Sequence, residues 1–289
     1  MDVSSPECRE KYVLCVSPSG LHRMAYTEWG DAGNPRVLIC LHGLARNGHD
    51  FDDVARATAG DYRVVCPDLV GRGKSGRLAD PAAYRPEQYV SDMLVLLARL
   101  DVEGVNWLGT SLGGVIGLVL ASLHDTPIRR LLLNDVGPEI HPAAMHRIAD
   151  YLGRAPSFAN IDEAEKYVRL VGAPFGNLTD AQWRRLTETN LRALPGGRFE
   201  MLYDPRIAEP FRDSAAEEVD LWRYYDRIRC PTLVLRGAQS DLLTIETAQA
   251  MTQRGPRARV IEIADVGHAP VLMDEAQIQI VRDFFNVAG

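Results

Sequence analysis

Short hydrophobic runs alternate with longer stretches of helical periodicity along the first half of the chain. Every position of 37–41 (VLICL) is apolar, which predicts a strand buried on both faces of a sheet. In 86–100 the apolar side chains recur every three to four residues, which predicts an amphipathic helix. This alternation favours a parallel sheet joined by crossover helices. The other expected strands are 11–16, 21–29, 62–66, 105–108, 130–133, 232–236 and 259–263, and 112–123 is expected to be a buried helix.

The alternation stops between Pro138 and Asp226. No clear strand pattern occurs in this segment, and glycines and prolines divide it into patches of helical periodicity. Because strand-like runs resume at residue 232, the segment interrupts one sheet. We therefore predict a core formed by residues 1–137 and 227–289, with residues 138–226 inserted as a helical cap. The patches expected to be helical are 141–152, 161–171, 179–194 and 217–227.

Composition and charge narrow the class of protein. The 289 residues are 46% hydrophobic and 25% charged, as in ordinary globular proteins, and the net charge of −7 offers no basic surface for nucleic acid. Neither a signal peptide nor an apolar run long enough for a membrane span is visible, so a cytoplasmic protein without membrane contact is expected. The five cysteines lack metal-ligand spacing, and we expect no metal and no cofactor. The sequence leaves monomer and homodimer open.

A serine flanked by glycines lies between an expected strand and the expected buried helix. The segment is Gly109-Thr110-Ser111-Leu112-Gly113, a G-x-S-x-G nucleophile elbow. Such a sharp turn needs glycines where a Cβ would clash, and it places the serine at a helix N-terminus, where the backbone favours an anion. Ser111 is therefore the candidate nucleophile.

A serine nucleophile needs a base, and the base needs an acid that orients it. His268 follows the last expected strand and is the candidate base. Asp241 ends a Gly-x-x-x-Asp turn after strand 232–236 and is the preferred acid, because a turn after the penultimate strand fits the usual place of the acid and gives the chain order Ser, Asp, His. Asp135, which follows strand 130–133, is the alternative acid.

Two backbone N–H groups are expected to bind the oxyanion of a tetrahedral intermediate. One belongs to Leu112, the residue after the nucleophile, and the other to Leu44, in the loop that follows 37–41. Four further residues of this loop are candidates for substrate binding: His42, Gly43, Arg46 and Asn47.

Ordered motifs resemble those of the α/β-hydrolase family over nearly the whole chain. Besides the elbow and the expected triad, His42-Gly43 is similar to the family's oxyanion loop, and 67–75 (PDLVGRGKS) is similar to its P-D-x-x-G-x-G-x-S loop. The resemblance implies an α/β fold with a mostly parallel eight-stranded sheet, flanking helices and an inserted cap. It implies the capped branch, which includes esterases, lactonases and carbon–carbon bond hydrolases. Ser111 argues against the epoxide hydrolases and haloalkane dehalogenases, which need an aspartate there.

The expected reaction is hydrolysis of a small or medium acyl compound, a carboxylic ester or lactone, through an acyl-enzyme. The alternatives are carbon–carbon bond cleavage of a vinylogous diketone, which the loop sequence Leu-Ala-Arg-Asn-Gly disfavours, and a non-catalytic receptor for a small molecule on a hydrolase scaffold. In the expected cap, the side chains that are candidates to line an apolar pocket are Met145, Tyr151, Phe158, Phe175 and Trp183.

Overall fold

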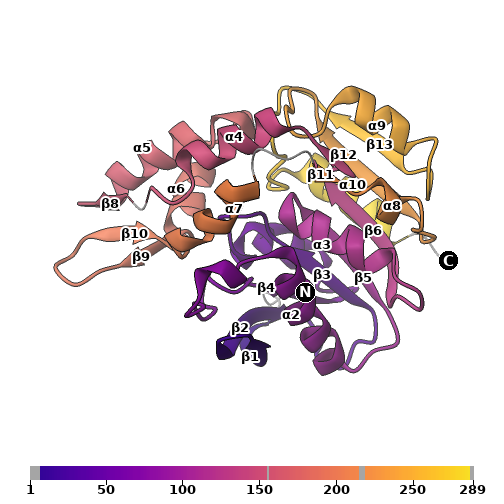
Figure 1. The fold of residues 1–289 in the computed structure, drawn as a ribbon, viewed down its shortest axis with the longest axis horizontal. Helices are drawn as coiled ribbons and strands as arrows, with labels where there is room; N and C mark the ends of the chain where they lie inside the picture. Colours follow the sequence, from indigo (N-terminus) through magenta and orange to yellow (C-terminus); the bar gives the residue numbers. More distant parts are fainter. Residues whose placement is uncertain (1–6, 155, 215–218, 287–289) are drawn as a thin grey trace, which may run out of the picture.

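A mostly parallel sheet of eight strands runs through the molecule (Figure 1). The structure is a computed structural model that describes residues 7–154, 156–214 and 219–286. The strands are β1 (Cys8–Ser17), β2 (Gly20–Trp29), β3 (Val37–Leu41), β4 (Arg63–Pro67), β5 (Val105–Thr110), β6 (Ile128–Asn134), β12 (Thr232–Gly237) and β13 (Arg259–Ile263). Their spatial order is β1-β2-β4-β3-β5-β6-β12-β13, with β2 antiparallel to both neighbours and the other neighbouring pairs parallel. The predicted α/β fold is confirmed.

Side chains of the central strands alternate between two hydrophobic cores, one on each face of the sheet. In β3, Val37, Ile39 and Leu41 belong to one core, and Leu38 and Cys40 belong to the other. Successive side chains of a strand point to opposite faces, so a strand covered on both sides must be apolar at every position. The uninterrupted apolar run is thus a consequence of the central place of β3.

Helices cover both faces of this sheet. On one face α1 (Asp52–Thr58) packs with α10 (Glu275–Phe285), and on the other α2 (Pro86–Leu100) packs with α3 (Leu112–Ala121). None of the described helices has the length and apolar content needed to cross a bilayer. The remaining elements of this part are the helix α9 (Ile245–Met251) and the 3-10 turns η1 (Gly48–Phe51) and η2 (Pro81–Ala83).

The segment between β6 and β12 contains short strands as well as helices. The elements within 142–214 gather on one side of the molecule, whereas the helix at 222–225 lies apart from them and contacts α3 (Figure 1). Three strands form a separate sheet and two others pair. The prediction of a segment without strands is therefore wrong, because two- and three-residue strands are too short to show alternation. The elements are β7 (Glu139–Ile140), α4 (Pro142–Tyr151), β8 (Ser157–Phe158), α5 (Ile161–Val171), η3 (Ala173–Phe175), α6 (Asp180–Glu188), β9 (Leu191–Ala193), β10 (Phe199–Met201), η4 (Pro205–Ile207), α7 (Ala208–Ser214), β11 (Val219–Asp220) and α8 (Trp222–Tyr225).

Two expected helices in this segment are shorter than predicted. The helix expected over 179–194 ends at Glu188, since the following residues form β9 and turn through 195–197 into β10. Of the helix expected over 217–227, Glu217 and Glu218 lie outside the described residues, and helix is found only from Trp222 to Tyr225.

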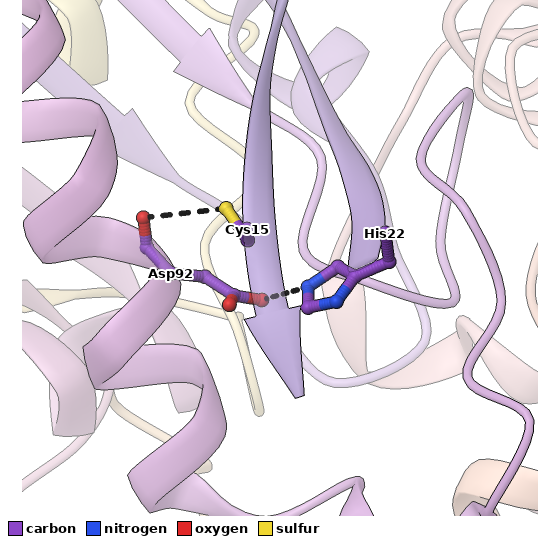
Figure 2. A group of neighbouring side chains, drawn as sticks. All are labelled: Cys15, His22 and Asp92. Carbon is purple, nitrogen blue, oxygen red and sulfur yellow. Dashed lines mark hydrogen bonds and ion pairs between the residues drawn. The ribbon is translucent and has the colours of Figure 1, made fainter. Parts of the chain in front are cut away.

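A buried polar contact fastens the β1–β2 hairpin to α2 (Figure 2). His22 Nε2 lies 2.8 Å from Asp92 Oδ2, and the thiol of Cys15 donates to the main-chain oxygen of Asp92 at 3.9 Å. All three residues are buried, and polar groups removed from water are costly unless they are hydrogen-bonded. The contact thus partners His22 Nε2 and the Cys15 thiol, while His22 Nδ1 is buried without a hydrogen-bond partner among the described residues.

Candidate active site

Ser111 occupies the tight turn between β5 and α3. Its φ and ψ angles are 53° and −119°, a strained conformation for a residue other than glycine. The flanking glycines are required, since an added Cβ at Gly109 would lie 2.3 Å from the oxygen of Gly113, and one at Gly113 would lie 2.1 Å from the oxygen of Leu41. The glycines therefore let the strand and helix approach closely enough to present Ser111.

The imidazole of His268 bridges Ser111 and Asp135. Its Nε2 lies 3.0 Å from Ser111 Oγ, and its Nδ1 lies 2.7 Å from Asp135 Oδ2. With the proton on Nδ1, the ring donates to the carboxylate and accepts from the serine hydroxyl. The Asp135 side chain is fully buried and that of His268 is 13% exposed, so water competes little for either contact. Ser111 and His268 are brought together as the sequence predicts.

Asp241, the acid preferred from the sequence, does not occupy this position, and the prediction is corrected. Its half-exposed carboxylate accepts hydrogen bonds from Nε and Nη2 of Arg147, the latter at 2.8 Å. The turn that Asp241 ends serves the acid instead: Gly237 N–H donates to Asp135 Oδ1 at 2.8 Å, and the Ser240 hydroxyl donates to Asp135 Oδ2 at 2.6 Å. The expected turn therefore supplies hydrogen-bond donors to the carboxylate, and the carboxylate itself comes from the alternative, Asp135.

Strand order explains why Asp135 is within reach of the other two residues. Asp135 directly follows β6, and β6 lies between β5, which leads to Ser111, and β12. The Asp135 N–H donates to Leu235 O at 2.8 Å, which holds its backbone against β12. The sequence does show an acidic residue directly after a buried strand, which indicates a candidate acid. It does not show which strands lie next to that strand in the sheet.

The loop after β3 passes close to Ser111. An added Cβ at Gly43 would lie 3.5 Å from Ser111 Cβ. The carbonyl of Leu44 accepts a hydrogen bond from Nε of the buried Arg72 at 2.8 Å, which fixes this part of the loop. On the other side of the serine, Leu112 is the first residue of α3, where a backbone N–H has no acceptor within the helix. The two amides predicted to bind an oxyanion therefore lie in segments that flank Ser111.

His42 holds this loop and does not face a ligand. Its side chain is fully buried, its Nδ1 lies 2.7 Å from Gly43 O, and its Nε2 accepts from Leu69 N–H at 2.9 Å. Burial lowers the pKa of His42 to about 4, so the ring is neutral and can donate through one nitrogen while accepting through the other. The prediction that His42 binds substrate is corrected to a role in loop structure.

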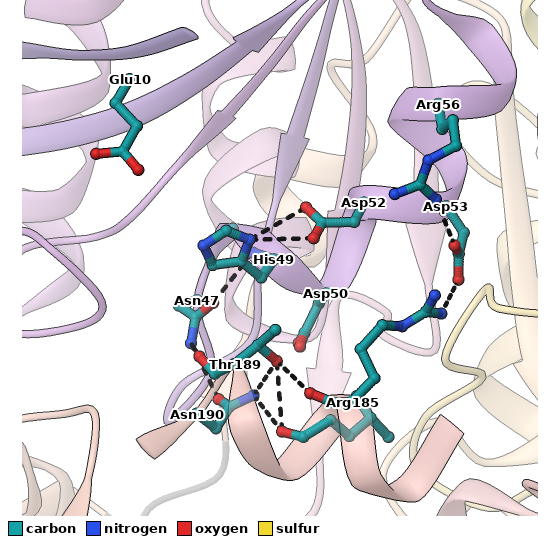
Figure 3. A network of polar contacts seen from close by, with 12 residues as sticks. Glu10, Asn47, His49, Asp50, Asp52, Asp53, Arg56, Arg185, Thr189 and Asn190 are labelled. Atoms are coloured by element: carbon teal, nitrogen blue, oxygen red, sulfur yellow. Dashed lines mark hydrogen bonds and ion pairs between the residues drawn. The ribbon is translucent and has the colours of Figure 1, made fainter. Parts of the chain in front are cut away.

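Asn47 links the same loop to the end of α6 (Figure 3). Its Nδ2 donates to Thr189 O at 2.9 Å and to Asn190 Oδ1 at 3.1 Å, while its Oδ1 caps η1 by accepting from His49 N–H at 3.0 Å. The side chain is fully buried. Asn47 thus ties the core to the segment between β6 and β12, and its predicted contact with substrate is also corrected.

Two cavities meet at Ser111. A cavity of about 130 Å³ is lined by His268 and by Gly43 and Arg46 of the loop. A cavity of about 480 Å³ is lined mostly by apolar residues such as Leu112, and also by Arg85 and Glu87. Leu44 and Ser111 line both. Of the side chains predicted to line a pocket, Tyr151 and Phe175 line the smaller cavity, Met145 lines the larger, and Phe158 and Trp183 belong to the hydrophobic core.

Among the described residues, one cluster has the composition of a metal site, Cys15, His22 and Asp92, whose potential ligand atoms lie within 4.8 Å of one another (Figure 2). Burial raises the pKa of the Cys15 thiol to about 12, whereas a metal ligand must be a thiolate. The cluster lies on β1, β2 and α2, and β4 and β3 separate β2 from β5. It therefore takes no part in the chemistry at Ser111.

Comparison with known proteins agrees with this architecture. Residues 36–274 match the family described as alpha/beta hydrolase fold. A 3-hydroxybutyrate-oligomer hydrolase of Cupriavidus necator is 52% identical over 285 residues, 96% of this chain and 97% of the relative. The crystal structure of a protein from Rickettsia typhi superposes with a TM-score of 0.90 at 32% identity, over 98% of this chain and all of the other. An alpha/beta hydrolase from Novosphingobium aromaticivorans does so with a TM-score of 0.87 at 36% identity, over 96% and 98%.

The chain belongs to the α/β-hydrolase family. It is a hydrolase, and its curated relatives include ester hydrolases, among them an esterase of Mycobacterium tuberculosis that is 27% identical over 88% of this chain and 83% of the relative. The predicted family and enzyme class are confirmed.

Proposed function

We propose that this enzyme hydrolyses carboxylic esters through an acyl-enzyme on Ser111, with His268 as the general base and Asp135 as the acid that orients it. The observation that carries the proposal is the position of His268, hydrogen-bonded to Ser111 Oγ at 3.0 Å and to Asp135 Oδ2 at 2.7 Å. This is the arrangement by which an unreactive hydroxyl becomes a nucleophile at neutral pH.

The reaction proceeds in two halves. Ser111 Oγ attacks the ester carbonyl as its proton passes to His268 Nε2, and the N–H groups of Leu44 and Leu112 bind the oxyanion, each donor contributing about 3 kcal/mol. The acyl C–O bond then breaks, and His268 gives the proton to the leaving oxygen. In the second half His268 takes a proton from water and the hydroxide attacks the acyl-enzyme. The bond between the acyl carbon and Ser111 Oγ then breaks, His268 returns the proton to Oγ, and the acid leaves. Asp135 stabilises the charged imidazole in both halves.

The proposed substrates are short oligomers of 3-hydroxybutyrate. Identity of 52% over nearly the whole chain with a 3-hydroxybutyrate-oligomer hydrolase supports this substrate class. The two cavities that meet at Ser111 also support it, because an internal ester of an oligomer needs room on both sides of the nucleophile. Residues 138–226 act as the cap in this proposal, since side chains of α4, such as Met145 and Tyr151, line these cavities.

The test measures release of 3-hydroxybutyrate from its linear dimer and trimer by the purified enzyme. Ser111→Ala and His268→Ala should abolish release, and Ser111→Ala should also abolish labelling by a fluorophosphonate. A buried serine elsewhere, Ser122, offers the control, because Ser122→Ala leaves the nucleophile in place. Labelling that persists in Ser111→Ala would reject the nucleophile. Cleavage of p-nitrophenyl butyrate without any release from the oligomers would reject the substrate class.

A further inference from the structure

The two ends of a 3-hydroxybutyrate oligomer are chemically different, and so are the two cavities at Ser111. One end of the oligomer is a hydroxyl and the other is a carboxylate. When an internal ester is cleaved, the acyl part that stays on the serine carries the hydroxyl end, and the leaving alcohol carries the carboxylate end. The cavity that receives the leaving group therefore has to accommodate a negative charge.

The position of His268 identifies the leaving-group side. A general acid must lie within hydrogen-bond reach of the oxygen that it protonates, and here that oxygen belongs to the leaving group. His268 lines the smaller cavity, of about 130 Å³, whereas the larger one, of about 480 Å³, borders Ser111 on the side of Leu112 and Val115. The leaving group thus enters the smaller cavity and the acyl chain enters the larger.

Two positively charged side chains line the smaller cavity. Among its described lining residues two guanidinium groups, Arg46 and Arg147, face a single carboxylate, Asp50. Arg46 donates to Asp50 through Nε at 2.9 Å and through Nη2 at 2.5 Å. Arg147 donates through Nε and Nη2 to Asp241, which does not line the cavity. In both ion pairs the arginine donates through Nε and Nη2. Each guanidinium group also carries N–H donors on Nη1, which can donate to a ligand.

Tyr151 lines the same cavity as the two arginines. Burial raises the pKa of its hydroxyl, the charges of Arg147 and Arg46 oppose that rise, and the charge of Asp241 adds to it. Tyr167 and Tyr203 line this cavity too. A carboxylate there would meet two guanidinium groups, in a molecule whose net charge is −7.

Resting on the proposed function, we propose that the smaller cavity binds the free carboxylate of the oligomer through Arg46 and Arg147, so that the enzyme removes 3-hydroxybutyrate from the carboxyl end. In the terminal unit the carboxylate is separated from the scissile ester oxygen by only two carbon atoms, which suits the smaller cavity. The acyl C–O bond breaks, and the monomer leaves with the proton from His268. Water then frees the shortened oligomer as a carboxylate, which is the substrate of the next round.

The direct test is a linear trimer with ¹³C in its carboxyl-terminal unit. In the first turnover the released monomer should carry the label, and the remaining dimer should not. Unlabelled monomer with labelled dimer as the first products would overturn the proposal and leave the proposed function intact. If the trimer is not cleaved at all, both proposals fail.

A second test compares the trimer as the free acid with its methyl ester, which has the same length and no charge. The wild-type enzyme should prefer the acid, and Arg147→Gln or Arg46→Gln should each lower the ratio of kcat/KM for acid over ester by about tenfold. The ratio does not depend on the fraction of folded enzyme. Arg184, which pairs with Asp162 and does not line either cavity, gives the matched control, Arg184→Gln, with an unchanged ratio. Equal cleavage of acid and ester by the wild type would refute carboxylate recognition.

Discussion

The hydroxyl of Ser240 donates to Asp135 Oδ2 at 2.6 Å, the same oxygen that lies 2.7 Å from Nδ1 of His268. The other oxygen, Oδ1, accepts from Gly237 N–H at 2.8 Å. A fully buried carboxylate is costly to ionise unless donors surround it, and here three donors do so. The turn after β12 therefore supplies two of the three hydrogen-bond donors that compensate for the burial of the Asp135 side chain.

Replacing Asp135 and Asp241 in turn tests which of the two orients His268. Asp135→Asn keeps the shape of the side chain but removes the charge and favours the wrong imidazole tautomer, so kcat should fall by about 10⁴-fold. Asp241→Asn changes only the ion pair with Arg147 and should alter kcat for p-nitrophenyl butyrate by less than about tenfold. Steady-state kinetics of the two purified variants checks this. The assignment fails if Asp241→Asn is the more damaging substitution.

Ser240→Ala tests the support of the buried carboxylate. The variant loses the hydrogen bond to the Asp135 carboxylate and the two that the hydroxyl accepts from Leu242 and Leu243 N–H, so the free energy of unfolding should fall by at least about 1.5–3 kcal/mol. The matched control is Ser122→Ala, since Ser122 donates to the uncharged Val119 O at 2.7 Å and should cost only about 0.5–1.5 kcal/mol. Urea unfolding of both variants gives the comparison, and equal losses would mean that the charge of Asp135 does not matter to this contact.

Asn47→Ala tests the link between the loop after β3 and the end of α6. The variant loses the contacts to Thr189 and Asn190, and we expect the free energy of unfolding to fall by about 2 kcal/mol. Activity should fall with it, because the same loop carries Leu44. Arg185→Gln removes the neighbouring ion pair with Asp53, which is partly exposed, and should cost less than about 1 kcal/mol. A loss in Arg185→Gln as large as in Asn47→Ala would contradict this ranking.

The buried His42 makes stability depend on pH. Burial lowers its pKa from 6.5 to about 4 in the folded protein, whereas in the unfolded chain it takes up a proton near 6.5. The unfolded state therefore binds more protons between these values, so the contribution of His42 is complete above pH 6.5 and is lost as the pH falls toward 4. Urea unfolding at about pH 7 and about pH 5 should show this decrease. In His42→Asn the decrease should be smaller, and an unchanged pH dependence would exclude His42 as its source.

The strands of the eight-stranded sheet, the glycine-flanked turn at Ser111 and the loop position of His268 could be predicted because each depends on local physics. A strand covered on both faces must be apolar throughout, as in 37–41, and a strand-to-helix turn as tight as that at Ser111 needs glycines at fixed offsets. His268 could be predicted in the same way, since it lies in the loop after the last strand and such loops often carry functional residues. These features are set by the nearest neighbours along the chain.

The sequence by itself predicted the turn that presents Ser111, the loop that carries His268 and the alternating pattern of the sheet. Only the tertiary structure decided that Asp135 contacts His268 and that Asp241 pairs with Arg147. It also decided that the buried side chains of His42 and Asn47 form hydrogen bonds to other parts of the protein. The physical reason is that these outcomes depend on which strands become neighbours and on which side chains then compete for the same donors. A sequence specifies the residue types, whereas the contacts between segments far apart in the chain are specified by packing alone.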